Sequence, residues 1–148
     1  MPIVNYPFQA MIPGARRRPI LPLRIRNPDP DSGQDFDTWG MIDTGADRIF
    51  IPSQIAEVIN HNVVFGDPKS IITASGNTTA YEHTCEIQIF AMGQNGQVDY
   101  GNMRITIPPK HIWVLPDLDK VILGVDDFLA DYILTIDYPN QMFSVRLP

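Results

Sequence analysis

The stretch that decides the fold of this chain is Trp39-Gly40-Met41-Ile42-Asp43-Thr44-Gly45-Ala46-Asp47. Its first four residues are mostly apolar, which is typical of a β-strand, and Asp43 follows directly. A carboxylate that a rigid strand delivers into a tight turn is well placed for chemistry. Gly45 permits a close approach that a side chain would block, and the hydroxyl of Thr44 can hydrogen-bond locally or to a neighbour. Asp-Thr-Gly is also a common turn composition. The rest of the sequence is therefore needed to distinguish a functional site from an ordinary turn.

Length and composition limit the classes of function. The chain has 148 residues, 44% of them hydrophobic, and a formal net charge of -6, which suits one domain with a sizeable core. Arg16-Arg17-Arg18 is the only basic run and is interpreted as a solvated segment, so nucleic acid is not expected as a partner. No apolar run reaches the length of a membrane span, so no membrane partner is expected either.

The single cysteine, Cys85, excludes an internal disulfide. It is predicted to be a small core residue and not a nucleophile. We expect a soluble cytoplasmic protein. The sequence has neither zinc-ligand spacing nor a glycine-rich phosphate loop, so no metal and no organic cofactor are expected.

The chain consists of many short segments separated by 14 prolines and 10 glycines. This pattern is typical of an all-β protein. Leu21, Leu23 and Ile25 alternate with polar residues or proline, which predicts a strand with one buried face. Pro22 suggests that this strand lies at a sheet edge. A second strand is predicted over residues 36–42.

The rest of the chain continues this pattern of short elements. A small polar turn at residues 74–78 predicts the tip of a long hairpin. Pro108 and Pro109 are predicted to end the strand over residues 103–107. Asp126 and Asp127 are interpreted as charges at the start of a short helix. Further strands are predicted over residues 48–51, 63–65, 70–73, 103–107 and 111–115, a short helix after Pro52, and a final hairpin over residues 132–147. Residues 121–124 form an apolar run that ends in glycine.

The order of these features resembles that of the retropepsin family of aspartic proteases, over roughly residues 19–147. A strand ends at Asp43-Thr44-Gly45-Ala46, and a hairpin with a glycine-bearing tip follows. The apolar segment Ile122-Leu123-Gly124 then leads into a short helix and a last strand. In the family these are the catalytic loop, the flap, the segment behind the catalytic loop, and the C-terminal helix and strand.

The resemblance implies an all-β, retropepsin-like acid-protease barrel with a flap hairpin and one or two short helices. Residues 20–148 would form this domain, and residues 1–19 would form an N-terminal arm that packs on the body or on a second subunit. The implied function is an aspartic endopeptidase, active as a homodimer on peptide or protein substrates.

The resemblance also implies roles for individual residues. Asp43 would be the catalytic carboxylate, Thr44 would grip its counterpart across the two-fold axis, and Gly45 would accept substrate backbone. The implied substrate-binding residues are Ala46, Asp47, Arg48, Ser75, Gly76, Asn77 and Ile122. Retropepsins often carry an arginine after the glycine that corresponds to Gly124, but Val125 stands here. A salt link from that position to Asp47 is therefore absent, and Arg48 or another arginine could replace it.

The chemistry explains why one motif is enough. Peptide hydrolysis by carboxylates needs one ionised group to activate water and one protonated group to polarise the carbonyl. Each chain supplies one Asp43, so a symmetric dimer supplies the pair. Two other interpretations stay open: a catalytically inactive retropepsin-like module that dimerises or binds peptides, and an unrelated β-barrel in which Asp43 is a structural turn residue.

Overall fold

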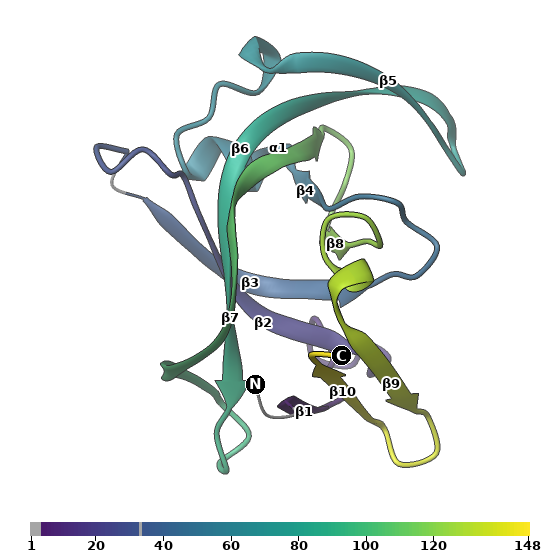
Figure 1. Cartoon of the computed structure of the whole chain (residues 1–148). Coiled ribbons are helices and arrows are strands. Elements are labelled where there is room, and N and C mark those ends of the chain that lie inside the picture. Colours follow the sequence, from purple (N-terminus) through teal and green to yellow (C-terminus); the bar gives the residue numbers. More distant parts are fainter. Residues whose placement is uncertain (1–3, 33) are drawn as a thin grey trace.

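The computed structural model describes residues 4–32 and 34–148, and Figure 1 shows their arrangement. Strands dominate this part of the chain and the helices are short. In chain order the elements are β1 (Val4–Pro7), β2 (Ile20–Arg26), β3 (Asp35–Ile42), β4 (Phe50–Pro52), α1 (Ser53–Val58), η1 (Val63–Phe65), β5 (Asp67–Thr73), β6 (Gly76–Met92), β7 (Val98–Leu115), β8 (Val121–Leu123), η2 (Leu129–Asp131), β9 (Ile133–Asp137) and β10 (Met142–Arg146). The predicted all-β class with short helices is confirmed.

A closed barrel forms the body of the molecule. One sheet has the strand order β2-β3-β8-β4-β7-β6-β5, and an additional pairing between β2 and β6 closes six of these strands into a ring. β5 lies outside the ring and forms a hairpin with β6. A second sheet has the order β1-β10-β9. None of the helices in residues 4–32 and 34–148 is long and apolar enough to cross a membrane.

The strand predicted around Leu21, Leu23 and Ile25 is present as β2, but its predicted edge position is wrong. β2 lies between β3 and β6. The pairing with β6 begins at Leu23, one residue beyond Pro22. The missing N–H of Pro22 is therefore not needed on that side, so a proline fits a strand that has two neighbours.

Pro108 and Pro109 do not end a strand, contrary to the sequence prediction. β7 runs through both of them, and they lie at a register shift between β6 and β7. Cys85 pairs with Lys110 and Ile87 pairs with Ile107, so the two prolines face the single residue between Cys85 and Ile87. A bulge leaves backbone groups unpaired, and proline, which has no N–H, suits such a position.

The strand predicted over residues 63–65 is also wrong, since these residues form the 3-10 helix η1. The amides of Phe65 and Gly66 donate to the carbonyls of Asn62 and Val63, at 3.0 and 3.1 Å. Only Val63 of the three apolar residues is buried. The apolar run over residues 63–65 therefore contributes one buried side chain to the core and does not form the buried face of a strand.

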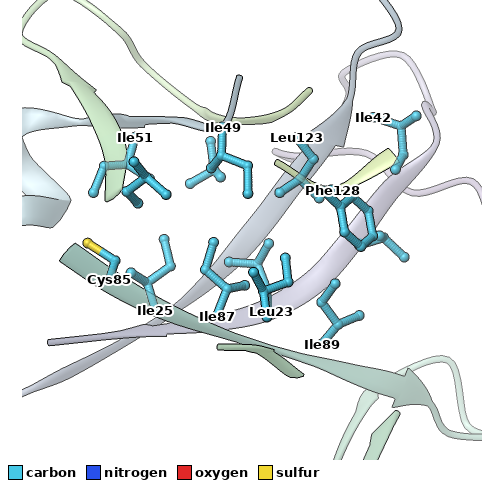
Figure 2. Close-up of a cluster of buried hydrophobic side chains, with 14 of the residues drawn as sticks. Leu23, Ile25, Ile42, Ile49, Ile51, Cys85, Ile87, Ile89, Leu123 and Phe128 are labelled. Atoms are coloured by element: carbon cyan, nitrogen blue, oxygen red, sulfur yellow. The ribbon is translucent and has the colours of Figure 1, made fainter. Parts of the chain in front are cut away.

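The barrel encloses an apolar core of mostly aliphatic side chains (Figure 2). Leu23, Ile25, Ile87 and Ile89 come from the paired strands β2 and β6, and Ile49, Ile51 and Leu123 come from the region of β4 and β8. Cys85 is fully buried among them, as predicted, and this burial raises the pKa of its thiol to about 12. A neutral buried thiol behaves as a small hydrophobic side chain.

The described part of the N-terminal arm packs on the body of the same chain. β1 pairs with β10, and Tyr6 and Phe8 belong to the buried core. The hydroxyl of Tyr6 donates to the carbonyl of Phe90 at 2.9 Å. Arg16, Arg17 and Arg18 are exposed, as expected for a solvated segment. A separate arm that ends at residue 19 stays a prediction.

Candidate active site

Asp43 begins a tight turn where β3 ends. Its amide donates to the carbonyl of Leu123 on β8 at 3.1 Å, and the amide of Ala46 donates to the carbonyl of Asp43 at 3.2 Å. The amide of Gly45 donates to Oδ1 of the Asp43 side chain at 2.9 Å. The backbone thus holds both ends of this turn and one oxygen of the carboxylate. The second carboxylate oxygen is left for other partners.

The segment that ends in Gly124 lies directly behind the Asp43 turn. The amide of Val125 donates to the carbonyl of Ala46 at 2.9 Å, and the amide of Asp126 donates to the carbonyl of Asp47 at 2.7 Å. A Cβ at Gly124 would lie 2.2 Å from the carbonyl oxygen of Arg48 and 2.7 Å from that of Ala46. Only glycine permits this approach, because Cβ atoms essentially never come so close to backbone.

Arg48 is bound to Asp127 and not to Asp47. Its Nε donates to Oδ2 of Asp127 at 2.9 Å, and the amide of Ile49 donates to the same oxygen at 2.8 Å. The interpretation of Asp127 as a helix-start charge is therefore wrong: it anchors the strand that leaves the active-site turn. Asp126 is exposed and lines the cleft in front of the Asp43 turn. It lies two residues before Phe128, the N-cap residue of η2.

A cleft of about 950 Å³ opens in front of the Asp43 turn. The predicted site residues that line it are Asp43, Gly45, Ala46, Asp47, Arg48 and Ile122. β5 and β6 arch over this side of the barrel (Figure 1), and residues 70–74 of that hairpin line the opposite wall. Apolar side chains from Phe50, Trp113, Leu115 and Leu118 complete the cleft.

The remaining predicted residues lie outside the cleft. Thr44 is exposed and is not part of the lining. Ser75, Gly76 and Asn77 line an adjoining hollow of about 300 Å³, which shares Thr73, Leu115 and Leu118 with the cleft. The structure therefore places the first hairpin strand and Ala74 of the turn against the cleft of a single chain, and the predicted residues Ser75, Gly76 and Asn77 beside it.

The hairpin tip has the small-residue geometry expected from the sequence. Thr73 pairs with Gly76, so Ala74 and Ser75 form the turn, and Gly76 has a φ of +109°. The Thr73 hydroxyl donates to the carbonyl of Gly76 at 3.0 Å and accepts from the amide of Ser75 at 3.2 Å. The tip is stabilised by hydrogen bonds within its own turn.

Sequence reasoning missed the apolar lining that β4, β7 and the loop after β7 supply. Phe50, Trp113, Leu115 and Leu118 stand outside the Asp-Thr-Gly motif in the sequence and reach the cleft through strand pairing. The parallel pairing of Phe50 with Trp113 brings the two aromatic rings together. No local sequence pattern signals a parallel pair of this kind.

A second hollow, of about 700 Å³, shares no lining residue with the cleft and contains His61, His83 and His111. The rings of His61 and His83 lie 4.6 Å apart, and their Nε2 atoms hydrogen-bond to the carbonyls of Thr84 and Val63. Burial, with a smaller effect of His83, lowers the pKa of His61. Within the part of the chain that the structure describes, no three His, Cys, Asp or Glu side chains are grouped to hold a metal ion.

Comparison with solved structures identifies the fold. A retropepsin-like aspartic protease from Rickettsia conorii superposes with a TM-score of 0.57 and 16% identity, over 97% of this chain and 91% of that chain. EIAV protease in complex with the inhibitor HBY-793 matches with a TM-score of 0.45 and 17% identity, over 80% of this chain and 92% of that chain. No family model and no curated protein sequence matches the chain. The chain therefore has the retropepsin-like, all-β fold that its motif order predicts.

Proposed function

We propose that this chain is an aspartic endopeptidase that acts as a homodimer, with Asp43 of each chain as one half of the catalytic pair. The observation that carries the proposal is the position of Asp43. It follows a barrel strand, is held by the amide of Gly45, and lines a cleft beneath the β5–β6 hairpin. The retropepsin-like fold of the chain supports the same conclusion.

The mechanism follows from bringing two such carboxylates together. Two carboxylates held close do not both ionise readily, so the pair shares one proton, a behaviour for which aspartic proteases in general are the known example. The ionised Asp43 takes a proton from water as the water attacks the peptide carbonyl. The protonated Asp43 donates to the carbonyl oxygen, and the same proton count is restored when the amine leaves.

Roles for the neighbouring residues belong to this proposal. Thr44, exposed beside Asp43, would contact the partner chain across the two-fold axis. Gly45, Ala46, Asp47, Arg48 and Ile122 would contact the substrate from one side of the cleft. Ser75, Gly76 and Asn77 would cover it from the flap tip after the hairpin moves. A cytoplasmic location is likewise proposed, and cell fractionation tests it.

Substitution of Asp43 by asparagine tests the proposal. Asparagine keeps the size of the side chain and its acceptor for the Gly45 amide but cannot exchange the catalytic proton. We expect turnover of a casein or peptide substrate to fall by about 10²–10⁴-fold, while the thermal unfolding midpoint stays close to that of the wild type. Asp31→Asn, at an exposed loop position, is the matched control and should keep full activity.

The same assay separates the competing interpretations. A wild-type chain that binds peptides but does not cleave them would be an inactive module with the same fold. Cleavage that survives in purified Asp43→Asn protein would remove Asp43 from the reaction.

A further inference from the structure

The hollow that contains His61, His83 and His111 is separate from the cleft in front of the Asp43 turn. It lies where the loop after β2, the end of η1 and the paired strands β6 and β7 meet. Its volume is about 700 Å³, which is within the range of cavities that enclose small ligands. This hollow is therefore large enough to receive a side chain from another molecule.

The histidines that line the hollow have a fixed arrangement of protons. Nε2 of His61 lies 2.9 Å from the carbonyl oxygen of Thr84, and Nε2 of His83 lies 2.8 Å from that of Val63. A carbonyl oxygen only accepts, so Nε2 carries the proton in each ring and Nδ1 of a neutral ring is an acceptor. Burial lowers the pKa of His61, which disfavours its charged form. His61 is therefore an uncharged lining residue whose remaining ring nitrogen is an acceptor.

Carboxylates give the hollow a negative charge. The three that line it belong to Asp29, Asp67 and Glu82. Oε1 of Glu82 accepts from Nε1 of Trp113 at 3.0 Å, whereas Oε2 lies 4.0 Å from Nδ1 of His111, beyond hydrogen-bond distance. Lys69 pairs with the exposed Asp67 at 3.1 Å, but no lysine or arginine of residues 4–32 and 34–148 lines the hollow itself. A bound cation would balance this charge.

An exposed aromatic ring stands at the edge of the same hollow. Phe65, the last residue of η1, lines the hollow and is 83% exposed. The next residue, Gly66, packs directly on β6: a Cβ there would overlap the carbonyl oxygen of Glu82 and lie 2.6 Å from Nε2 of His83. This packing fixes the backbone beside Phe65. The face of an aromatic ring attracts a cation, so Phe65 favours the same class of ligand as the carboxylates.

We propose that this hollow is a binding site for a guanidinium group, supplied by an arginine side chain of a peptide or protein. The acceptors of the hollow come from separate segments, and the five N–H donors of a guanidinium can reach several of them at once. Its planar face can also stack on the ring of Phe65. The proposal goes beyond the proteolytic function, because the hollow and the cleft share no lining residue.

Peptide titration of the Asp43→Asn chain tests the proposal without cleavage of the probe. The probes are acetyl-Gly-Xaa-Gly-amide peptides with arginine or citrulline at Xaa, because citrulline has the shape of arginine without its charge. Backbone amide NMR measures the affinity and the location of binding together. We expect the arginine peptide to bind at least about tenfold more tightly than the citrulline peptide. It should shift the resonances of Gly66 and Thr84, which belong to the hollow, and not that of Gly45.

Three variants separate the hollow from the general negative charge of the chain. Glu82→Gln removes a charge but keeps the acceptor oxygen for Trp113, and it should weaken arginine binding at least about tenfold. Phe65→Ala, at an exposed position, should weaken it about threefold and serves if Glu82→Gln does not fold. Asp126→Asn is the matched control: it removes the same charge from the cleft and should leave the affinity within about twofold.

Four results would overturn the proposal. They are equal affinities for the arginine and citrulline peptides, resonance shifts confined to the Asp43 turn, unchanged binding by folded Glu82→Gln and Phe65→Ala proteins, and no binding up to about 10 mM. A loss of affinity in Asp126→Asn that equals the loss in Glu82→Gln would likewise assign the arginine to the general charge of the chain and overturn the site.

Sedimentation identifies the source of the arginine. The run Arg16-Arg17-Arg18 is exposed, so a second copy of this chain could supply the guanidinium group. Assemblies larger than a dimer, lost both in an Arg16→Gln, Arg17→Gln, Arg18→Gln protein and on addition of the arginine peptide, would support the site and assign the second copy. Arginine binding in the hollow by a wild type without such assemblies would support the site and assign the arginine to a different protein.

Discussion

At the scale of single residues, Gly124 is the position where one added carbon atom should do most damage. A Cβ there would overlap the carbonyl oxygens of Arg48 and Ala46, which belong to the Asp43 turn. We expect Gly124→Ala to lower the free energy of unfolding by about 3 kcal/mol and to reduce activity, because the turn must move to make room. Chemical denaturation measures the first effect and peptide turnover the second.

The control for Gly124 is Gly101→Ala. A Cβ at Gly101 would meet only the Asp99 side chain, at 3.3 Å, and Gly101 is exposed. If both alanine variants unfold at the same denaturant concentration as the wild type, the close packing behind the Asp43 turn does not stabilise the fold.

His61 should make the stability of the fold depend on pH. Burial lowers its pKa in the folded chain below the usual 6.5. As the pH falls below 6.5, the unfolded chain binds a proton that folded His61 does not yet bind, so the folded state loses stability. This loss continues down to the lowered pKa and then stops.

Thermal unfolding of the wild type and of His61→Gln between pH 7.5 and pH 5 measures this effect. The melting temperature of the wild type should fall more steeply than that of His61→Gln over this range. His111→Gln is the control, since His111 is exposed and its replacement should leave the slope in place. Parallel curves for the wild type and His61→Gln would exclude His61 as the group responsible.

Residue-level prediction from sequence succeeds where the determinants are local. The tight turn predicted at Asp43 is present, and the amides of its near neighbours Gly45 and Ala46 close it. The ion pair of Arg48 with Asp127 joins residues 79 positions apart. Two aspartates before a short apolar run look like helix-start charges whether or not an arginine reaches one of them, so the sequence alone could not identify this pair.

At the scale of elements, the β5–β6 hairpin is the part expected to move when peptide binds. β5 pairs with no described strand other than β6, and residues 74–77 at the turn are exposed. Few packing contacts and exposed backbone are the conditions for local opening. Deuterium exchange of the amides over residues 70–78 should slow when a peptide that binds the cleft is added to Asp43→Asn protein.

The barrel strands β2 and β3 provide the internal reference, because both lie in the closed ring and should exchange slowly with or without peptide. Equal exchange at the hairpin in the presence and absence of bound peptide would show that it is not a flap.

Element-level prediction is right where side chains alternate and wrong where proline or a single buried residue interrupts the pattern. The alternation around Leu23 identifies β2, since one face of it meets the core. Pro22 and Pro108-Pro109 look like strand limits in the sequence because proline lacks an N–H. In the structure, each of these prolines lies at a position where the neighbouring strand β6 does not need a backbone N–H donor. That placement depends on the register of a distant strand, which residue type does not specify.

At the scale of the whole molecule, activity should require two chains. Each chain carries one Asp43 turn, and β9 offers an edge for self-association. β1 contains Pro7, and β5 contains Pro68 and Lys69, residues that discourage pairing at an edge, but β9 contains neither proline nor lysine. We expect sedimentation to show a dimer and specific activity to fall on dilution as the dimer dissociates.

Mixing experiments check this requirement directly. When Asp43→Asn chains are added to the wild type, activity per wild-type chain should decline, because mixed dimers have only one titratable Asp43. Asp31→Asn chains provide the control and should cause no decline. Full activity in a species that sediments as a monomer would contradict the expected dimer.

The order of motifs along the chain is sufficient to predict the barrel, because each motif has a fixed place in it. The sequence does not decide whether the N-terminal segment packs on the body of the chain or on a second subunit. Tyr6 and Phe8 enter the core only because β1 meets β10. This contact joins opposite ends of the described chain, and no sequence pattern in residues 4–8 indicates which surface receives them.

The pairing of β1 with β10 also determines when the protein can fold during its synthesis. Val4 pairs with Val145 and Tyr6 with Phe143, so β1 has no partner until β10 has been made. Tyr6 and Phe8 therefore remain exposed to water, or to chaperones, until β10 has been made. Pairing over so long a loop is also slow. The core of this domain is therefore complete only once β10 has been made and has paired with β1.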